Sequence, residues 1–67
     1  MSLFCFAADF IVLRNGLPVA TFVCHPVVAA LTYEAARSCA LEVAQECVRD
    51  LSELGLTAYF HLDYLPQ

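Results

Sequence analysis

Three side chains of this 67-residue chain could together move a proton: Asp9, His61 and Asp63. His61 and Asp63 are two residues apart in a stretch that alternates between apolar and polar residues, so both point to one side of a predicted strand. A histidine oriented by a carboxylate is the usual proton-transfer unit, which makes a small acid/base enzyme one candidate. The sequence has no nucleophile motif and no glycine-rich loop. Solvated polar residues on the outer side of a strand are far commoner, so we predict no catalytic residues and no enzyme.

A second kind of chemistry depends on the four cysteines of the chain, which are Cys5, Cys24, Cys39 and Cys47. Cys39 and Cys47 lie two turns apart on one predicted helix, about 12 Å by the helical rise, which is too far for a disulfide. Cys5 and Cys24 are expected on the opposite side of the sheet, where a contact between them stays open. There the two cysteines could also form a zinc site with His61 and either Asp9 or Asp63. The spacings typical of zinc sites are absent, so we predict no metal, no cofactor and four reduced, buried thiols.

Composition excludes several classes of protein. The net charge is −4, and the chain has three arginines and no lysine, so we expect no binding to nucleic acid or to an anionic membrane surface. The longest uncharged stretch, 17–33, contains Pro18 and Pro26 and is shorter than the roughly 20 apolar residues of a membrane span. A membrane-associated protein is therefore an alternative that we do not favour. The first residues lack the basic region of a secretory signal, which favours a cytoplasmic protein.

The first part of the chain predicts a β-hairpin. Strands are expected at about 3–13 and 18–25, because Asn15-Gly16 between them is the strongest short-range hairpin signal and favours a type I′ turn. Pro18 cannot donate to a ladder, so the second strand is expected at an edge of the sheet. Counting from the turn predicts these opposite pairs: Arg14 and Leu17, Leu13 and Pro18, Val12 and Val19, Phe10 and Thr21.

The second part predicts one helix and one further strand. Thr32 is typical of an N-cap and Gly55 of a C-terminal stop, which places the helix at about 33–54. The alternating segment 57–65 predicts a half-buried strand, whereas 27–31 is either coil or a short extra strand. A right-handed crossover then puts the last strand beside the first. We predict a single α+β domain over residues 1–67, of order ββαβ, with a three-stranded antiparallel sheet (order 2-1-3) covered on one face by one long helix.

The apolar residues exceed what so small a core can bury, since 61% of the chain is hydrophobic. We expect the following residues to lie between helix and sheet: Phe4, Phe6, Phe10, Val12, Val19, Val23, Ala36, Cys39, Ala40, Val43, Cys47, Leu51, Leu54, Phe60 and Leu62. Two surfaces remain as interaction candidates. One is the uncovered sheet face with Ile11, Leu13, Phe22, Tyr59, His61 and Asp63, and the other is a helix flank with Leu41 and Val48. We predict a homodimer that forms through one of these two surfaces, because one apolar sheet face would otherwise remain exposed to water.

The segment Leu31-Thr32-Tyr33-Glu34-Ala35-Ala36 opens the long helix after the hairpin, and the helix closes at Gly55 before the last strand. In this arrangement the chain resembles small antitoxin domains of the HicB type, although the proline-glycine-cysteine turn and the aspartate-rich first hairpin of that family are absent. The resemblance implies an antitoxin-type domain as an alternative function. In size and acidity the chain is similar to many phage-encoded inhibitors of host machinery, including anti-CRISPR proteins.

Together these features favour a non-enzymatic protein-interaction module. We expect a small acidic regulator or inhibitor, of phage or mobile-element type, that occupies a surface on a larger protein.

Overall fold

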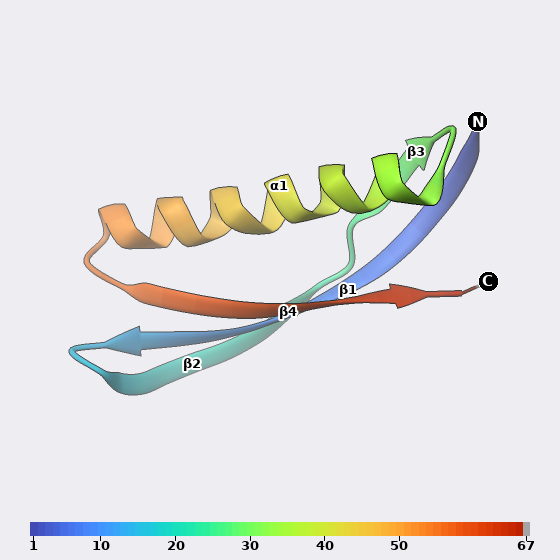
Figure 1. Ribbon diagram of the computed structural model, residues 1–67. Helices are drawn as coiled ribbons and strands as arrows, with labels where there is room; N and C mark the ends of the chain where they lie inside the picture. The colour runs from blue at the N-terminus through green and yellow to red at the C-terminus, as the bar shows by residue number, and fades with distance from the viewer. Residues whose placement is uncertain (67) are drawn as a thin grey trace.

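The strands form one antiparallel sheet, and a single long helix lies along one face of it (Figure 1). The computed structural model describes residues 1–66. Its elements are β1 (Ser2–Arg14), β2 (Leu17–Cys24), β3 (Val27–Ala30), α1 (Tyr33–Glu53) and β4 (Thr57–Leu65). The predicted α+β fold is confirmed, with the last strand beside the first and β3 as an additional short strand.

β1 is the central strand of the sheet. Asp9 pairs with both Val23 of β2 and His61 of β4, so β2 and β4 lie on opposite edges of β1. Cys5 pairs with Val27 of β3 as well as with a residue of β4, so β3 also lies opposite β4. β2 and β3 therefore follow each other along one edge of β1, and β4 pairs with residues 5–13 along the other edge.

The turns and helix ends form as local sequence rules predict. Asn15 and Gly16 have φ values of 51° and 79°, which are the two positive values of a type I′ turn. The Thr32 hydroxyl accepts a hydrogen bond from the Ala35 backbone N–H at 3.2 Å, as an N-cap does. At the other end Gly55 has φ 78°, and the N–H groups of Gly55 and Leu56 donate to the Ser52 and Leu51 carbonyls. These signals fix the ends of α1.

The register of the hairpin differs from the predicted one beyond Pro18. Leu13 pairs with Pro18 as expected, but Val12 pairs with Ala20, so Val19 is an extra residue in a β-bulge. The predicted pairs of Val12 with Val19 and of Phe10 with Thr21 are therefore wrong. Pro18 has no N–H for a regular ladder of hydrogen bonds. β2 has apolar residues on both of its faces, so shifting its register by one residue still places apolar side chains against the core.

The bulge exchanges the two faces of β2. Phe22 lies opposite Phe10 and stacks on it, with ring centroids 4.5 Å apart and planes 8° apart. Phe22 and Cys24 consequently face the helix side, and Val23 faces away from it, which corrects the prediction for each of these three residues. The stacked pair offers a reason for the bulge, because it buries two aromatic faces that the regular register would separate.

The helix contacts the sheet through alanines spaced four residues apart. Ala36, Ala40 and Ala44 are buried, and their small side chains let α1 approach the strands closely. Cys39, Val43 and Leu54 were predicted to face the sheet but are exposed, which is a correction. Compared with the predicted orientation, α1 is rotated about its axis so that Ala44 and Val48 turn toward the sheet. The small alanine side chains, rather than bulkier ones, lie where the helix and the sheet come closest.

The core has two parts along the sheet. Phe6 is the largest fully buried side chain and lies with Ala30, Ala36 and Ala40 near the start of the helix. The second cluster consists of Ala8, Phe10 and Ala44, and half-buried side chains pack against it. The molecule measures 42 × 20 × 12 Å, so it is one sheet and one helix thick, and no element of the described residues 1–66 lies above the other face of the sheet (Figure 1).

Candidate functional site

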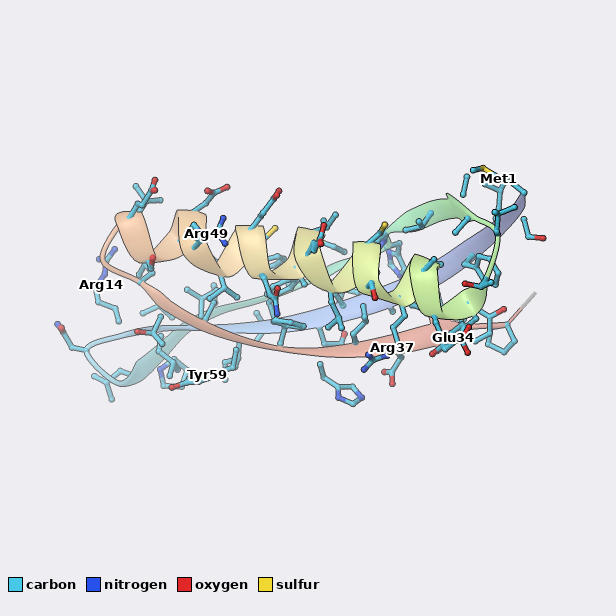
Figure 2. All side chains as sticks on the ribbon, turned by 45° about the horizontal axis from the view of Figure 1, so that its top comes forward. Met1, Arg14, Glu34, Arg37, Arg49 and Tyr59 are labelled. Carbon is cyan, nitrogen blue, oxygen red and sulfur yellow. The ribbon has the colours of Figure 1, made fainter. Side chains whose placement is uncertain are left out.

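The sheet face that α1 does not cover is the candidate site, and we call it the open face. It consists of the side chains that point to the side of the sheet opposite to Phe6, Ala8 and Phe10 of the core. Its members are Cys5, Ala7, Asp9, Ile11 and Leu13 of β1, Thr21 and Val23 of β2, and Thr57, Tyr59, His61, Asp63 and Leu65 of β4. Figure 2 shows Tyr59 on the side of the sheet away from the helix.

An open depression of about 530 Å³ is centred on this face. It is lined by Asp9, Phe10, Ile11, Thr21, Phe22, Val23, Tyr59, Phe60 and His61. The side chains of the three phenylalanines point to the helix side of the sheet. These residues therefore form the floor of the depression, between the side chains that point outward. Tyr59 is 62% exposed and Val23 53% exposed, which are large fractions for apolar side chains. The depression is therefore mainly apolar and open to a partner.

A polar group borders the apolar depression. Asp9 pairs directly with His61 across the two strands, and His61 and Asp63 lie on the same face of β4. His61 Nε2 donates a hydrogen bond to Asp63 Oδ1 at 2.8 Å. The predicted trio is therefore brought together on one surface. The side chains of His61 and Asp63 are 75% and 53% exposed, so water surrounds the pair and it contributes little to stability.

The structure separates the residues of the zinc hypothesis. Cys24 lies on the helix side and Cys5 on the open face, so the two cannot share a site, and the alternative that they contact one another is wrong as well. Within residues 1–66, no group of three or more histidine, cysteine, aspartate or glutamate side chains is placed to hold a metal ion. The hypothesis of a zinc site that uses both Cys5 and Cys24 is therefore wrong.

The helix cysteines differ in their surroundings. Cys39 is exposed, whereas Cys47 is half-buried against the Ala8, Phe10 and Ala44 cluster. Burial raises the pKa of the Cys47 thiol, and the neighbouring Cys24 raises it further. No Cα of α1 lies within 8 Å of β2 in the described chain, so a disulfide between Cys24 and Cys47 would require backbone movement. The expectation that all four cysteines are buried is wrong for Cys39.

This difference predicts the order in which the helix thiols react. In the folded protein at pH 8, Cys39 should react with an alkylating reagent several times faster than Cys47, because a raised pKa leaves less thiolate and the packing limits access. Mass spectrometry of peptides from a timed reaction measures both rates at once. In denaturant the two rates should become similar. Equal rates in the folded state would contradict the packing of Cys47.

The predicted interaction residues fall into two groups. Ile11, Leu13, Tyr59, His61 and Asp63 all lie on the open face. Phe22 does not, because the bulge turns it toward the core. Thr21 and Val23 take its place on this face, and the only signal for them in the sequence is the proline that precedes the bulge.

The two predicted helix-flank residues are less accessible than expected. Val48 packs against the second core cluster and Leu41 is half-buried, so the free apolar surface of the helix lies instead at Cys39 and Val43. Whether Leu41 and Val48 contact a partner stays a prediction.

In the described part of the chain, α1 is not long and apolar enough to cross a membrane. Comparison of the chain with protein-family models, with curated proteins and with solved structures gave no match.

Proposed function

We propose that the chain is a non-enzymatic protein-interaction module, a regulator or inhibitor that occupies a surface on a larger protein through its open face. The observation that carries the proposal is the depression of about 530 Å³ on the sheet face that α1 does not cover. A single helix covers only one side of the sheet, so no second layer formed by residues 1–66 covers the exposed apolar residues Ile11, Val23 and Tyr59 of the other side. Burying apolar surface of this kind is the main driving force of association.

The composition of the open face supports recognition of a protein. Tyr59 stands beside the depression as a large, exposed aromatic side chain, and such residues are the commonest energetic anchors of interfaces. Ile11 and Val23 supply apolar contact around it. The hydrated His61–Asp63 pair lies at the border, where interfaces usually have their polar rim. This arrangement gives one strong contact surrounded by groups that set orientation.

The charge of the face indicates the chemistry of the partner. Asp9 and Asp63 both project from it, and the whole chain has a net charge of −4. Electrostatic complementarity favours partners that present arginine or lysine near an apolar patch. A small acidic module seated on such a patch would block whatever else the basic surface binds, which is how we propose that it inhibits or regulates.

The test compares two substitutions of an exposed apolar residue by aspartate. Tyr59→Asp alters the open face, and Val43→Asp makes a matched change on the outer side of α1, where the side chain is also exposed. We expect the unmodified protein and Val43→Asp to retain one stoichiometric partner from a lysate of the source cells. Tyr59→Asp should lose it, with at least about a tenfold weaker affinity, because truncation of an aromatic anchor typically costs 2 kcal/mol or more.

Circular dichroism of both variants shows whether each is folded. Recovery of the same partner by Tyr59→Asp would contradict the open-face proposal, and so would loss of the partner by Val43→Asp alone. Reproducible recovery of no partner by the unmodified protein would contradict the proposed function itself.

A further inference from the structure

The two edges of the sheet differ in their protection against pairing with another strand. β2 contains Pro18 and the bulge at Val19, and β3 beside it is only four residues long. Prolines, bulges and short strands are the features that stop an edge from pairing with another chain. β4 is nine residues long and has no proline, glycine or lysine, and within residues 1–66 it pairs with β1 alone. Its outer edge presents backbone N–H and C=O groups that a further strand could bind.

A second depression lies between the helix and this unprotected strand. Its volume is about 260 Å³, and it is lined by Gln45 and Val48 of α1 and by Ala58, Tyr59 and Phe60 of β4. Leu41 is two helical turns before Val48 and continues this side of α1 toward the helix start. A strand added to β4 would point half of its side chains toward this apolar depression. The edge therefore offers both backbone hydrogen bonds and a place for side chains.

We propose that β4 is the pairing edge of a symmetric homodimer, in which two copies of β4 run antiparallel with Leu62 opposite Leu62 of the partner subunit. The two sheets become one continuous sheet, and both helices lie on the same side of it. The partner subunit's Tyr64 then stands beside Phe60, next to the depression described above. The occupant is a second copy because the sequence of β4 is complementary to itself in this register.

The pairs on either side of the central leucines are favourable. His61 lies opposite the partner subunit's Asp63, and the symmetry makes this pair twice. His61 Nε2 already donates to Asp63 of its own chain. In the doubly protonated ring Nδ1 carries a second N–H, and this group can donate to the partner's carboxylate. Phe60 meets the partner's Tyr64, and aromatic pairs of this kind stabilise antiparallel strands.

Neighbouring registers that keep both helices on one side are worse. Sliding one strand by two residues in one direction brings His61 opposite His61 of the partner subunit. Sliding it by two residues in the other direction brings Asp63 opposite Asp63 of the partner subunit, and like charges directly opposite each other are destabilising. The charge pattern of β4 therefore selects the pairing centred on Leu62. The dimer leaves the open face uncovered, so this proposal does not depend on the larger partner proposed above.

Sedimentation velocity over a range of concentrations tests the dimer with two matched charge reversals. Asp63→Lys removes the acceptor of His61 in both symmetric pairs, whereas Asp50→Lys makes the same change on an exposed helix position. We expect the unmodified protein and Asp50→Lys to form dimers with similar dissociation constants. Asp63→Lys should raise the constant about tenfold, because two pairs are lost together. A concentration-independent monomer for the unmodified protein, or an unchanged constant for Asp63→Lys, would overturn the proposal.

Cross-linking tests the register itself and does not depend on the stability of the lysine variant. Chains with His61→Cys are mixed with chains with Asp63→Cys and exposed to oxidised glutathione, which accepts the two electrons and two protons when a disulfide forms. Directly opposite residues in antiparallel strands have Cα atoms within disulfide range, so we expect a covalent heterodimer. His61→Cys mixed with Thr57→Cys is the control, because those positions are far apart in the proposed register. Equal cross-linking of the control mixture would exclude pairing centred on Leu62.

Discussion

Replacing Phe6 with alanine is expected to unfold most of the protein at room temperature. The Phe6 ring is 1% exposed and lies at the centre of the cluster with Ala30, Ala36 and Ala40. Such a truncation costs about 3–5 kcal/mol, because apolar contacts are lost and a cavity remains. A core of this size rarely supplies more than about 3–5 kcal/mol in total, so the loss is comparable to the whole stability. Urea unfolding followed by circular dichroism measures the effect.

The control for this experiment is Leu3→Ala on the same strand. Leu3 is 63% exposed, so its truncation should change the free energy of unfolding by less than about 0.5 kcal/mol. If Phe6→Ala retains a cooperative transition at the midpoint of the unmodified protein, the position of the core is wrong.

The second large effect is expected at the contact between helix and sheet, where Ala36→Leu should destabilise the protein by about 1–3 kcal/mol. Ala36 is fully buried between α1 and β1, so a longer side chain must push the helix away from the strands. In a domain of this size, each kcal/mol lowers Tm by about 4–8 °C. Thermal unfolding followed by circular dichroism checks the shift.

Ala35→Leu is a closely matched control, since the neighbouring alanine is exposed and leucine is nearly as good a helix former as alanine. Its Tm should stay within about 4 °C of that of the unmodified protein, because surface substitutions change stability by no more than about 0.5 kcal/mol. A similar loss in both variants would mean that the effect arises within the helix rather than at its contact with the sheet.

Local rules accounted for the parts of the fold that depend on a few adjacent residues. The Asn15-Gly16 turn, the Thr32 cap and the Gly55 stop each rest on backbone geometry that only certain residues adopt easily, and all three are confirmed. The alternation in β4 correctly placed Tyr59, His61 and Asp63 on one face. These signals sufficed to predict the order of the elements and most of the candidate site.

The errors arose where the apolar pattern does not distinguish between two arrangements. β2 is apolar on both faces, so its sequence does not oppose the bulge that turns Phe22 inward and Val23 outward. α1 has apolar residues around much of its circumference, and its rotation depends on which side chains are small enough to touch the sheet. Both choices depend on packing between distant segments. They could not be inferred from periodicity within either segment.

The row of buried alanines also determines what holds the helix in place along its length. Ala36, Ala40 and Ala44 themselves make a smooth contact with the strands. Larger side chains of α1 reach the sheet near the helix start, where the Tyr33 ring lies 5.1 Å from the Tyr64 ring, and at Val48. α1 is about 31 Å long and β4 about 30 Å long. Because the two lengths match, the connection from β3 to α1 and the connection from α1 to β4 can both be very short. One connection ends in the Thr32 cap, and the other contains the Leu56 N–H bond to the Leu51 carbonyl. These two short connections, together with the packing of Tyr33 at the helix start, fix the position of the helix along its axis.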